Sequence, residues 1–219
     1  MKLYPKYFAS LIKSYETAFQ EYASIIDLDV KRTKAASENP TIYKELTNIL
    51  LAYAKYALNH QAKLESGLLP RSKRIGGLFH RKRHPGRSLI YLIQECFWIL
   101  VYIIEELMPK EYYSNMLALK ADIQIIYKLL SIKDPELVQH FEVVSVDMSL
   151  ITVESFLTLY TNTCHPDLTE VIMDHFFVHG PVVLLKAMVL LLTYMRQDLL
   201  NTDNLGSLEL RSRRLPHGV

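Results

Sequence analysis

Apolar residues recur at every third or fourth position along most of this 219-residue chain, which is the spacing of amphipathic helices. The chain has only 7 glycines, so it offers few of the tight turns that β-hairpins need. Half of its residues are hydrophobic and 22% are charged, a composition that can bury a core. We therefore predict an all-α fold, a single helical domain of about eight helices.

Turn and capping signals divide this pattern into separate helices. Three dipeptides place a capping or turn residue directly before proline, as helix starts often do: Asn39-Pro40, Asp134-Pro135 and Gly180-Pro181. Ser88 occupies the position of an N-cap, and the polar stretch 27–40 is expected to be a loop. The expected helices cover residues 4–26, 41–65, 88–108, 111–131, 134–141, 150–161, 167–177 and 181–201.

The formal net charge is +2, but the basic residues are unevenly distributed. The stretch from Arg71 to Arg87 holds seven Lys and Arg residues and no acidic one, so the rest of the chain is net acidic. The broad basic face of a nucleic-acid-binding domain is therefore not expected. This basic loop has two interpretations, a peripheral contact with anionic membrane lipid or a solvated insertion.

Several common kinds of site have no counterpart in the sequence. There is no GxxxxGK[ST] phosphate-binding loop, and the N-terminus lacks the uninterrupted apolar run of a signal peptide. Cys96 and Cys164 each fall within an apolar helical pattern, so we interpret them as buried, reduced thiols of a cytoplasmic protein. His175 and His179 have a spacing that suits a metal, but no third ligand is evident, which favours packing or surface histidines.

One short motif resembles that of a known family. In the segment 26–33, IDLDVKRT, the residues Ile26, Asp29 and Arg32 match the IxxDxxR(T) motif of the TBC domains of Rab GTPase-activating proteins. In that family the arginine is a finger that enters the active site of a bound GTPase. The resemblance implies that Arg32 is catalytic and that Asp29 and Ile26 support its position.

Further segments resemble the family in the same order along the chain. They are residues 46–54, which resemble the helix between the two finger motifs, 95–98 (ECFW), 155–160 (SFLTLY) and 171–180 (VIMDHFFVHG). The resemblance divides the chain into an N-terminal helix over 1–24, a TBC-like Rab-GAP domain over 25–200 and a flexible tail over 201–219. Residues 71–87 are then a basic loop insertion within the domain.

The chain departs from the family at the second finger, a YxQ motif whose glutamine orients the attacking water. The nearest match is Asn59-His60-Gln61-Ala62, which keeps Gln61 but lacks the aromatic residue and the glycine that usually follows. Loss of that glycine hinders close approach of the backbone to the nucleotide. Two family tryptophans are replaced by Ser155 and Met173, which we interpret as changes in the core.

Three functions are open at this point. The first, which we favour, is a GTPase-activating protein for a Rab-family small GTPase that uses Arg32 and, as a second candidate, Gln61. The partner carries Mg²⁺ and GTP, so the chain would need no cofactor or metal of its own.

The second is a catalytically inactive docking subunit with a coiled-coil scaffold as partner. It rests on the segment 64–72, LESGLLPRS, which resembles a TBC family member in the tuberous sclerosis complex, a complex that acts on the GTPase Rheb. The third is a peripheral-membrane adaptor that contacts endomembranes through Arg71 to Arg87. All three fit a cytoplasmic protein in vesicle trafficking or TOR signalling.

Overall fold

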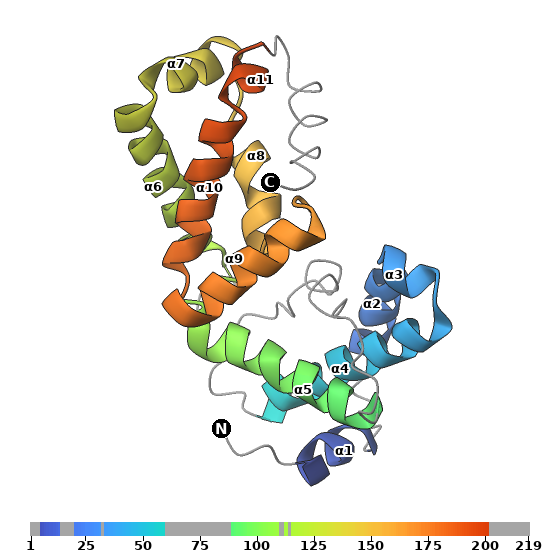
Figure 1. The fold of residues 1–219 in the computed structure, drawn as a ribbon. Helices are drawn as coiled ribbons and strands as arrows, with labels where there is room; N and C mark the ends of the chain where they lie inside the picture. The colour runs from blue at the N-terminus through green and yellow to red at the C-terminus, as the bar shows by residue number, and fades with distance from the viewer. Residues whose placement is uncertain are drawn as a thin grey trace. The chain divides into compact units, whose positions relative to one another are not determined.

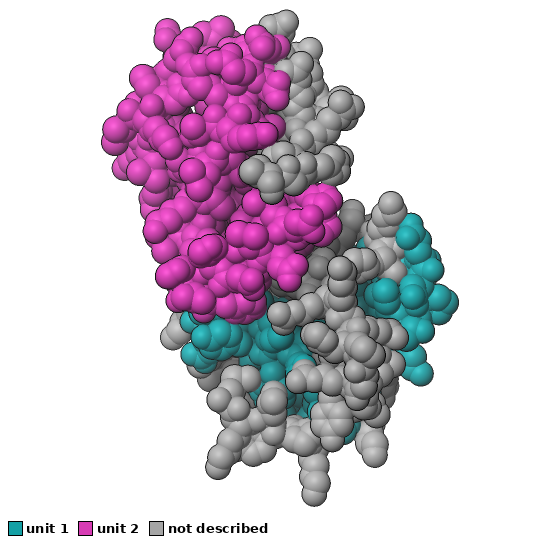
Figure 2. All heavy atoms as spheres, viewed as in Figure 1, with its two compact units in different colours: residues 1–110 teal, residues 111–219 magenta. Residues whose placement is uncertain are grey.

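The computed structural model describes residues 5–13, 20–31, 33–59, 89–109, 112–113 and 115–201. Every regular element within these ranges is a helix, which confirms the predicted all-α class. The chain forms two compact units, residues 1–110 and residues 111–219, which Figure 2 shows in separate colours. Each unit buries its own apolar residues.

The first unit is organised around one long helix, α4 (Pro40–Asn59). Four other helices pack against it, as Figure 1 shows: α1 (Pro5–Lys13), α2 (Gln20–Lys31), α3 (Lys34–Ser37) and α5 (Leu89–Tyr102). Because all four depend on α4 for their packing, the position of this helix determines the position of the others.

The sequence of α4 explains both its start and its packing. The side-chain oxygen of Asn39 accepts a hydrogen bond of 2.9 Å from the amide of Thr41, and Pro40 occupies the first turn, as the sequence predicts. The buried side of the helix shows helical spacing through Leu46, Ile49, Leu50, Tyr53 and Ala57. Since most of the stability of a helix in a protein comes from packing of its apolar side, this buried side is what stabilises α4.

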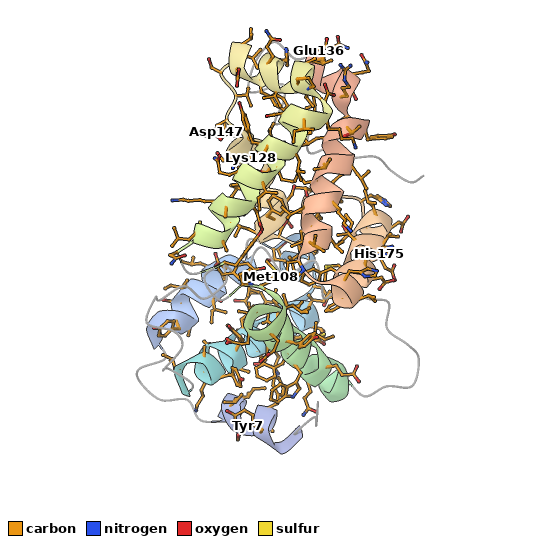
Figure 3. The ribbon with its side chains drawn as sticks, turned by 90° about the vertical axis from the view of Figure 1, so that its left-hand side faces the viewer. Tyr7, Met108, Lys128, Glu136, Asp147 and His175 are labelled. Atoms are coloured by element: carbon orange, nitrogen blue, oxygen red, sulfur yellow. The ribbon has the colours of Figure 1, made fainter. Side chains whose placement is uncertain are left out.

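An aromatic cluster fills the core between α1, α4 and α5. The ring of Phe97 has no exposed surface and lies 5.1 Å from that of Phe8 and 4.9 Å from that of Trp98, measured between centroids. Tyr56 meets Phe97 and Trp98 edge-on at 6.1 and 6.2 Å. Tyr7, labelled in Figure 3, stacks on Trp98 at 6.2 Å. Tilted and edge-to-face rings are the arrangements that aromatic pairs favour.

The helix α5 continues into a π-helical turn over Ile103–Leu107. In this turn the carboxylate of Glu105 accepts a hydrogen bond of 3.0 Å from the hydroxyl of Tyr53 in α4. The helix expected over residues 88–108 is therefore present from Leu89, with a wider last turn than an α-helix has.

The described part of the second unit contains six helices: α6 (Leu117–Lys133), α7 (Pro135–Val143), α8 (Met148–Leu157), α9 (Pro166–His179), α10 (Val182–Tyr194) and α11 (Arg196–Leu200). The helix α6 packs against α7, α8 and α10, and α10 also packs against α9 (Figure 1). Leu119, Ile126, Leu130 and Leu184 are at most 2% exposed and lie in the core of this unit.

Asp134 connects the start of α7 to α11. One carboxylate oxygen accepts a hydrogen bond of 3.2 Å from the amide of Leu137, which is the predicted capping role. The other accepts a bond of 2.7 Å from Nε of Arg196. Arg196 also donates to Glu136, which Figure 3 labels. The Asp134 side chain is only 10% exposed, so few solvent molecules could replace these partners.

A buried tyrosine holds the turn after α8. Leu159 and Tyr160 have φ values of 49° and 65°, in the left-handed region that residues with a Cβ rarely adopt. The hydroxyl of Tyr160 donates a hydrogen bond of 2.6 Å to the carbonyl of Leu184 in α10. Burial raises the pKa of this hydroxyl well above its ordinary value, so it remains a donor. The bond ties the strained turn to α10.

Ser155 and Met173, which replace the two family tryptophans, are core residues as predicted. They are 3% and 6% exposed. The hydroxyl of Ser155 donates a hydrogen bond of 3.0 Å to that of Thr163. The smaller polar side chain is thus satisfied within the core.

The prediction of a loop over residues 27–40 is wrong, because α2 continues to Lys31 and α3 follows it. Val30 is completely buried four residues after Ile26, and Lys31 forms an ion pair of 2.6 Å with Asp27. Both pairs are i,i+4 neighbours of a continuing helix. The polar composition of this stretch reflects a solvent-facing side and not the absence of a helix.

Three further bounds differ from the expected ones. The helix α6 begins at Leu117 and not at residue 111, because Met116 adopts a left-handed φ of 60°. The helix α8 begins at Met148 and ends at Leu157, before the two residues with positive φ, and not over residues 150–161. The helix expected over 181–201 is divided at Met195, whose ψ of 5° departs from the helical value.

Cys96 and Cys164 are partly buried free thiols. Burial raises the pKa of each to about 11, so both are protonated at neutral pH. No helix in the described ranges is both long and apolar enough to cross a bilayer. The basic loop Arg71 to Arg87, the expected cap Ser88 and residues 202–219 of the expected tail lie outside the described residues.

Replacement of Asp134 by alanine should lower the free energy of unfolding by about 1–2 kcal/mol, because α7 loses its cap. Asn at the same position can still cap the helix but carries no charge for Arg196. We therefore expect Asp134→Asn to lose less stability than Asp134→Ala in urea denaturation followed by circular dichroism. Equal losses in the two variants would instead assign the effect to the ion pair.

Candidate functional site

The helix α2 carries the first part of the IxxDxxR motif and is anchored by its apolar side. Ile26 is 3% exposed and Val30 is completely buried, four residues apart on the side that packs against α4. Asp29 is half-buried at the edge of this contact. On the outer side, Ile25 and Leu28 are 49% and 54% exposed. The rotation of α2 about its axis is thus fixed by burial, with two apolar side chains directed to solvent.

The carboxylate of Asp27 fixes the last turn of α2 against the first turn of α4. It accepts a hydrogen bond from the hydroxyl of Tyr43, and its second oxygen lies 2.6 Å from Nζ of Lys31. Tyr43 is the fourth residue of α4. The contact therefore joins two segments that are 16 residues apart in the sequence.

A compact turn follows α2. The hydroxyl of Thr33 donates a bond of 3.3 Å to the carbonyl of Asp29, and the amide of Thr33 donates a bond of 3.0 Å to the carbonyl of Val30. The carbonyl of Thr33 accepts bonds of 3.0 and 2.9 Å from the amides of Ala36 and Ser37. The residues on both sides of position 32 are therefore held by backbone hydrogen bonds.

A shallow, open hollow lies beside this turn. Its volume is about 350 Å³, and it is lined by Lys31, Ala36, Ser37, Pro40 and Tyr43. These residues come from the ends of α2, α3 and α4 that meet at the motif. A hollow of this kind suits contact with another protein surface better than enclosure of a small molecule.

The structure describes two of the four predicted site residues, Ile26 and Asp29, both on α2. Arg32 and Gln61 lie outside the described residues. Arg32 is flanked by Lys31 and Thr33 near the start of α4, whereas Gln61 follows Asn59 at its end. A helix of 20 residues is about 30 Å long, so the described segments that flank these two residues lie at opposite ends of α4.

The sequence reasoning missed Tyr43 and Asp27. The i,i+4 spacing of Asp27 and Lys31 is a helix signal that could have extended α2 into the motif. No local signal indicates that Tyr43 bonds to Asp27, because that contact depends on how α2 and α4 pack.

The His175–His179 pair lies on the outside of α9. Both side chains are exposed, and the ring centroids are 5.8 Å apart in a stacked arrangement. Figure 3 labels His175 on this helix. Within the described ranges, no group of three or more His, Cys, Asp or Glu residues is arranged to hold a metal ion. Stacking explains the histidine pair without a ligand.

Comparison with known proteins identifies a family. The sequence model described as "Rab-GTPase-TBC domain" matches residues 2–200. Mouse TBC1 domain family member 2B is 30% identical over 207 residues, which is 91% of this chain and 20% of that protein. Rat small G protein signaling modulator 3 is 30% identical over 122 residues, which is 55% of this chain and 16% of that protein. The chain thus matches a fifth or less of the length of these relatives.

A solved structure agrees with the sequence comparison at the level of the fold. The structure of a Chlamydomonas flagellar RabGAP TBC domain matches 96% of this chain and 67% of that one, with a TM-score of 0.76 and 20% sequence identity. At this sequence identity the similarity shows a shared arrangement of helices.

Replacement of Tyr43 by phenylalanine tests the junction between α2 and α4. The change removes only the hydroxyl, so the Asp27 carboxylate loses a neutral donor and the ring keeps its packing. We expect a loss of about 1 kcal/mol in the free energy of unfolding. Amides of the last turn of α2 should also exchange faster with deuterium, while those of α6 keep their rates. Unchanged exchange in α2 would show that burial of Ile26 and Val30 alone fixes this helix.

Proposed function

The chain belongs to the Rab-GTPase-TBC domain family, and from this premise we propose that it accelerates GTP hydrolysis by a Rab-type small GTPase through Arg32. The observation that carries the proposal is the IxxDxxR motif in a chain whose residues 2–200 match the family. In this proposal the partner GTPase carries the nucleotide and its Mg²⁺ ion. This chain contributes a docking surface and the positive charge of Arg32.

The chemistry requires the kind of residue that Arg32 is. Transfer of the terminal phosphoryl group to water spreads negative charge over the phosphoryl oxygens. A guanidinium group is planar and permanently charged and can donate two parallel hydrogen bonds, so it stabilises this charge better than the ammonium group of lysine.

The surroundings of Arg32 support this role through positioning. Lys31 ends a helix whose rotation is fixed by Ile26 and Val30, and Thr33 begins a hydrogen-bonded turn. Catalytic side chains on rigid supports lose less entropy when they engage the reacting groups.

The exposed pair Ile25 and Leu28 is the proposed docking contact. Both side chains are about half exposed on α2, and Arg32 follows Leu28 by four residues in the sequence. Apolar side chains that flank a functional charge exclude water and bring the partner into register.

Gln61 is a weaker candidate for positioning the attacking water. The segment 59–62 keeps the glutamine of the family motif and lacks its glycine and aromatic residue. This departure favours one alternative, a catalytically inactive docking subunit that binds a coiled-coil scaffold in a complex acting on a small GTPase such as Rheb.

We expect the chain to accelerate single-turnover GTP hydrolysis by at least one member of a panel of Rab GTPases plus Rheb. Arg32→Ala should reduce the acceleration by about a thousandfold or more, since a finger in trans contributes this much. Arg32→Lys should restore little, because lysine lacks the planar fork. Gln61→Ala should have the smaller effect.

Circular dichroism of each variant is the control for folding. No acceleration across the panel by a folded chain would replace the activator by the docking subunit. Full acceleration by Arg32→Ala would contradict the role of Arg32.

Replacement of Leu28 by glutamate tests the docking contact separately from the chemistry. Because Leu28 is exposed, the variant should fold, and it should bind the GTPase about tenfold more weakly or worse in a titration. Leu190→Glu is the matched control, since Leu190 is 63% exposed on α10 of the other unit. Equal binding by the two variants would remove Leu28 from the interface.

A further inference from the structure

The helix α6 is apolar on two sides, and only one of them is covered. Leu119, Ile123, Ile126 and Leu130 are buried, on the side that packs against α7, α8 and α10. The outer side carries four large apolar residues with the exposed fractions Leu117 56%, Ile125 42%, Leu129 44% and Ile132 84%. A surface helix normally carries charged and polar residues there.

These four residues form one continuous stripe, called here the outer stripe. With the exposed Ala121, they follow one another at intervals of four, four, four and three residues, which keeps them on one side of an α-helix. From Leu117 to Ile132 the stripe is about 22 Å long at the rise of an α-helix. Its straight, narrow shape matches the side of a second helix packed along α6.

The exposed charged side chains of α6 are all lysines. Lys120, Lys128 and Lys133 are exposed, and none of them forms an ion pair within the described part of the chain. Figure 3 labels Lys128 on α6. The only acidic residue in α6 is Asp122, which is partly buried. The lysines therefore present uncompensated positive charge along an apolar surface.

We propose that the outer stripe of α6 binds an amphipathic helix of a partner protein, with acidic side chains flanking its own apolar residues. Such a helix covers the apolar side chains and neutralises the three lysines at once. A second copy of this chain would bring three more lysines to the contact. Three lysines are also fewer than the clusters of four to eight with which proteins recognise anionic lipid, so a membrane fits less well.

The test uses two synthetic helical peptides of about three heptads with leucine at the a and d positions. One carries glutamate at the flanking e and g positions, and the other carries lysine there. Titration of the full chain against each labelled peptide should show saturable binding of the glutamate peptide alone. Leu129→Glu should weaken this binding about tenfold or more. Leu190→Glu, an exposed leucine on α10, is the control and should leave it unchanged.

A variant in which the lysine charges beside the outer stripe are reversed tests the charge preference directly. With Lys128→Glu and Lys133→Glu together, the chain should lose the glutamate peptide and gain the lysine peptide, because the apolar stripe remains while the flanking charges reverse. All three variants should accelerate GTP hydrolysis as the unmodified chain does, so a failure here leaves the Arg32 proposal standing.

Three results would overturn the proposal. The first is equal binding, or no saturable binding, of the two peptides. The second is a dimer in analytical ultracentrifugation that Leu129→Glu dissociates, which would identify a second copy as the occupant. The third is cosedimentation with phosphatidylserine vesicles that Leu129→Glu abolishes, which would identify a membrane surface.

Discussion

The burial of α2 on α4 is the constraint on which the candidate site depends. Ile26 and Val30 are too far inside the core to allow α2 to rotate, so Ile25 and Leu28 must face outward and Asp29 must lie at the edge. The bond from Tyr43 to Asp27 then limits sliding of α2 along α4. Because α1, α3 and α5 also pack on α4, the support of the motif is the core of the whole first unit. An arginine that acts on a partner needs such a support, since small displacements of a catalytic group are costly.

Helix bounds were predicted correctly where the capping residue and the apolar stripe lie within the helix's own segment. They were not predicted where they depend on contacts with residues far away in the sequence. The helix α4 has a cap, a proline and a long apolar stripe within its own residues, so its start was predicted correctly. The end of α2 has a single buried apolar residue, Val30, and its burial depends on α4. The left-handed φ of Met116 and Tyr160 likewise has no signal in residue type, because neither is glycine. The hydroxyl bond of Tyr160 to Leu184 shows that tertiary contact maintains such a backbone.

The same distinction applies to the residues of the candidate site. Ile26 and Asp29 were found because they belong to one short motif, whereas Tyr43 acts across 16 residues. The outer stripe of α6 could not be predicted as an exposed surface. Apolar residues on more than one side of a helix predict burial on each of those sides. Only the packing of α7, α8 and α10 shows which half of that pattern the unit itself covers. A sequence pattern thus indicates how much apolar surface a helix must bury. It does not indicate which other element covers that surface.

The departures of this chain from the family motifs affect the two proposed roles differently. These roles are stabilisation of charge on the phosphoryl group and orientation of the attacking water. Stabilising charge on phosphoryl oxygens needs one long, permanently charged side chain on a firm support, and substitutions in the core such as Ser155 and Met173 leave this requirement intact. Orienting a water molecule needs close approach of the backbone to the nucleotide, which Ala62 in place of glycine opposes. The proposed activation therefore depends more on Arg32 than on Gln61.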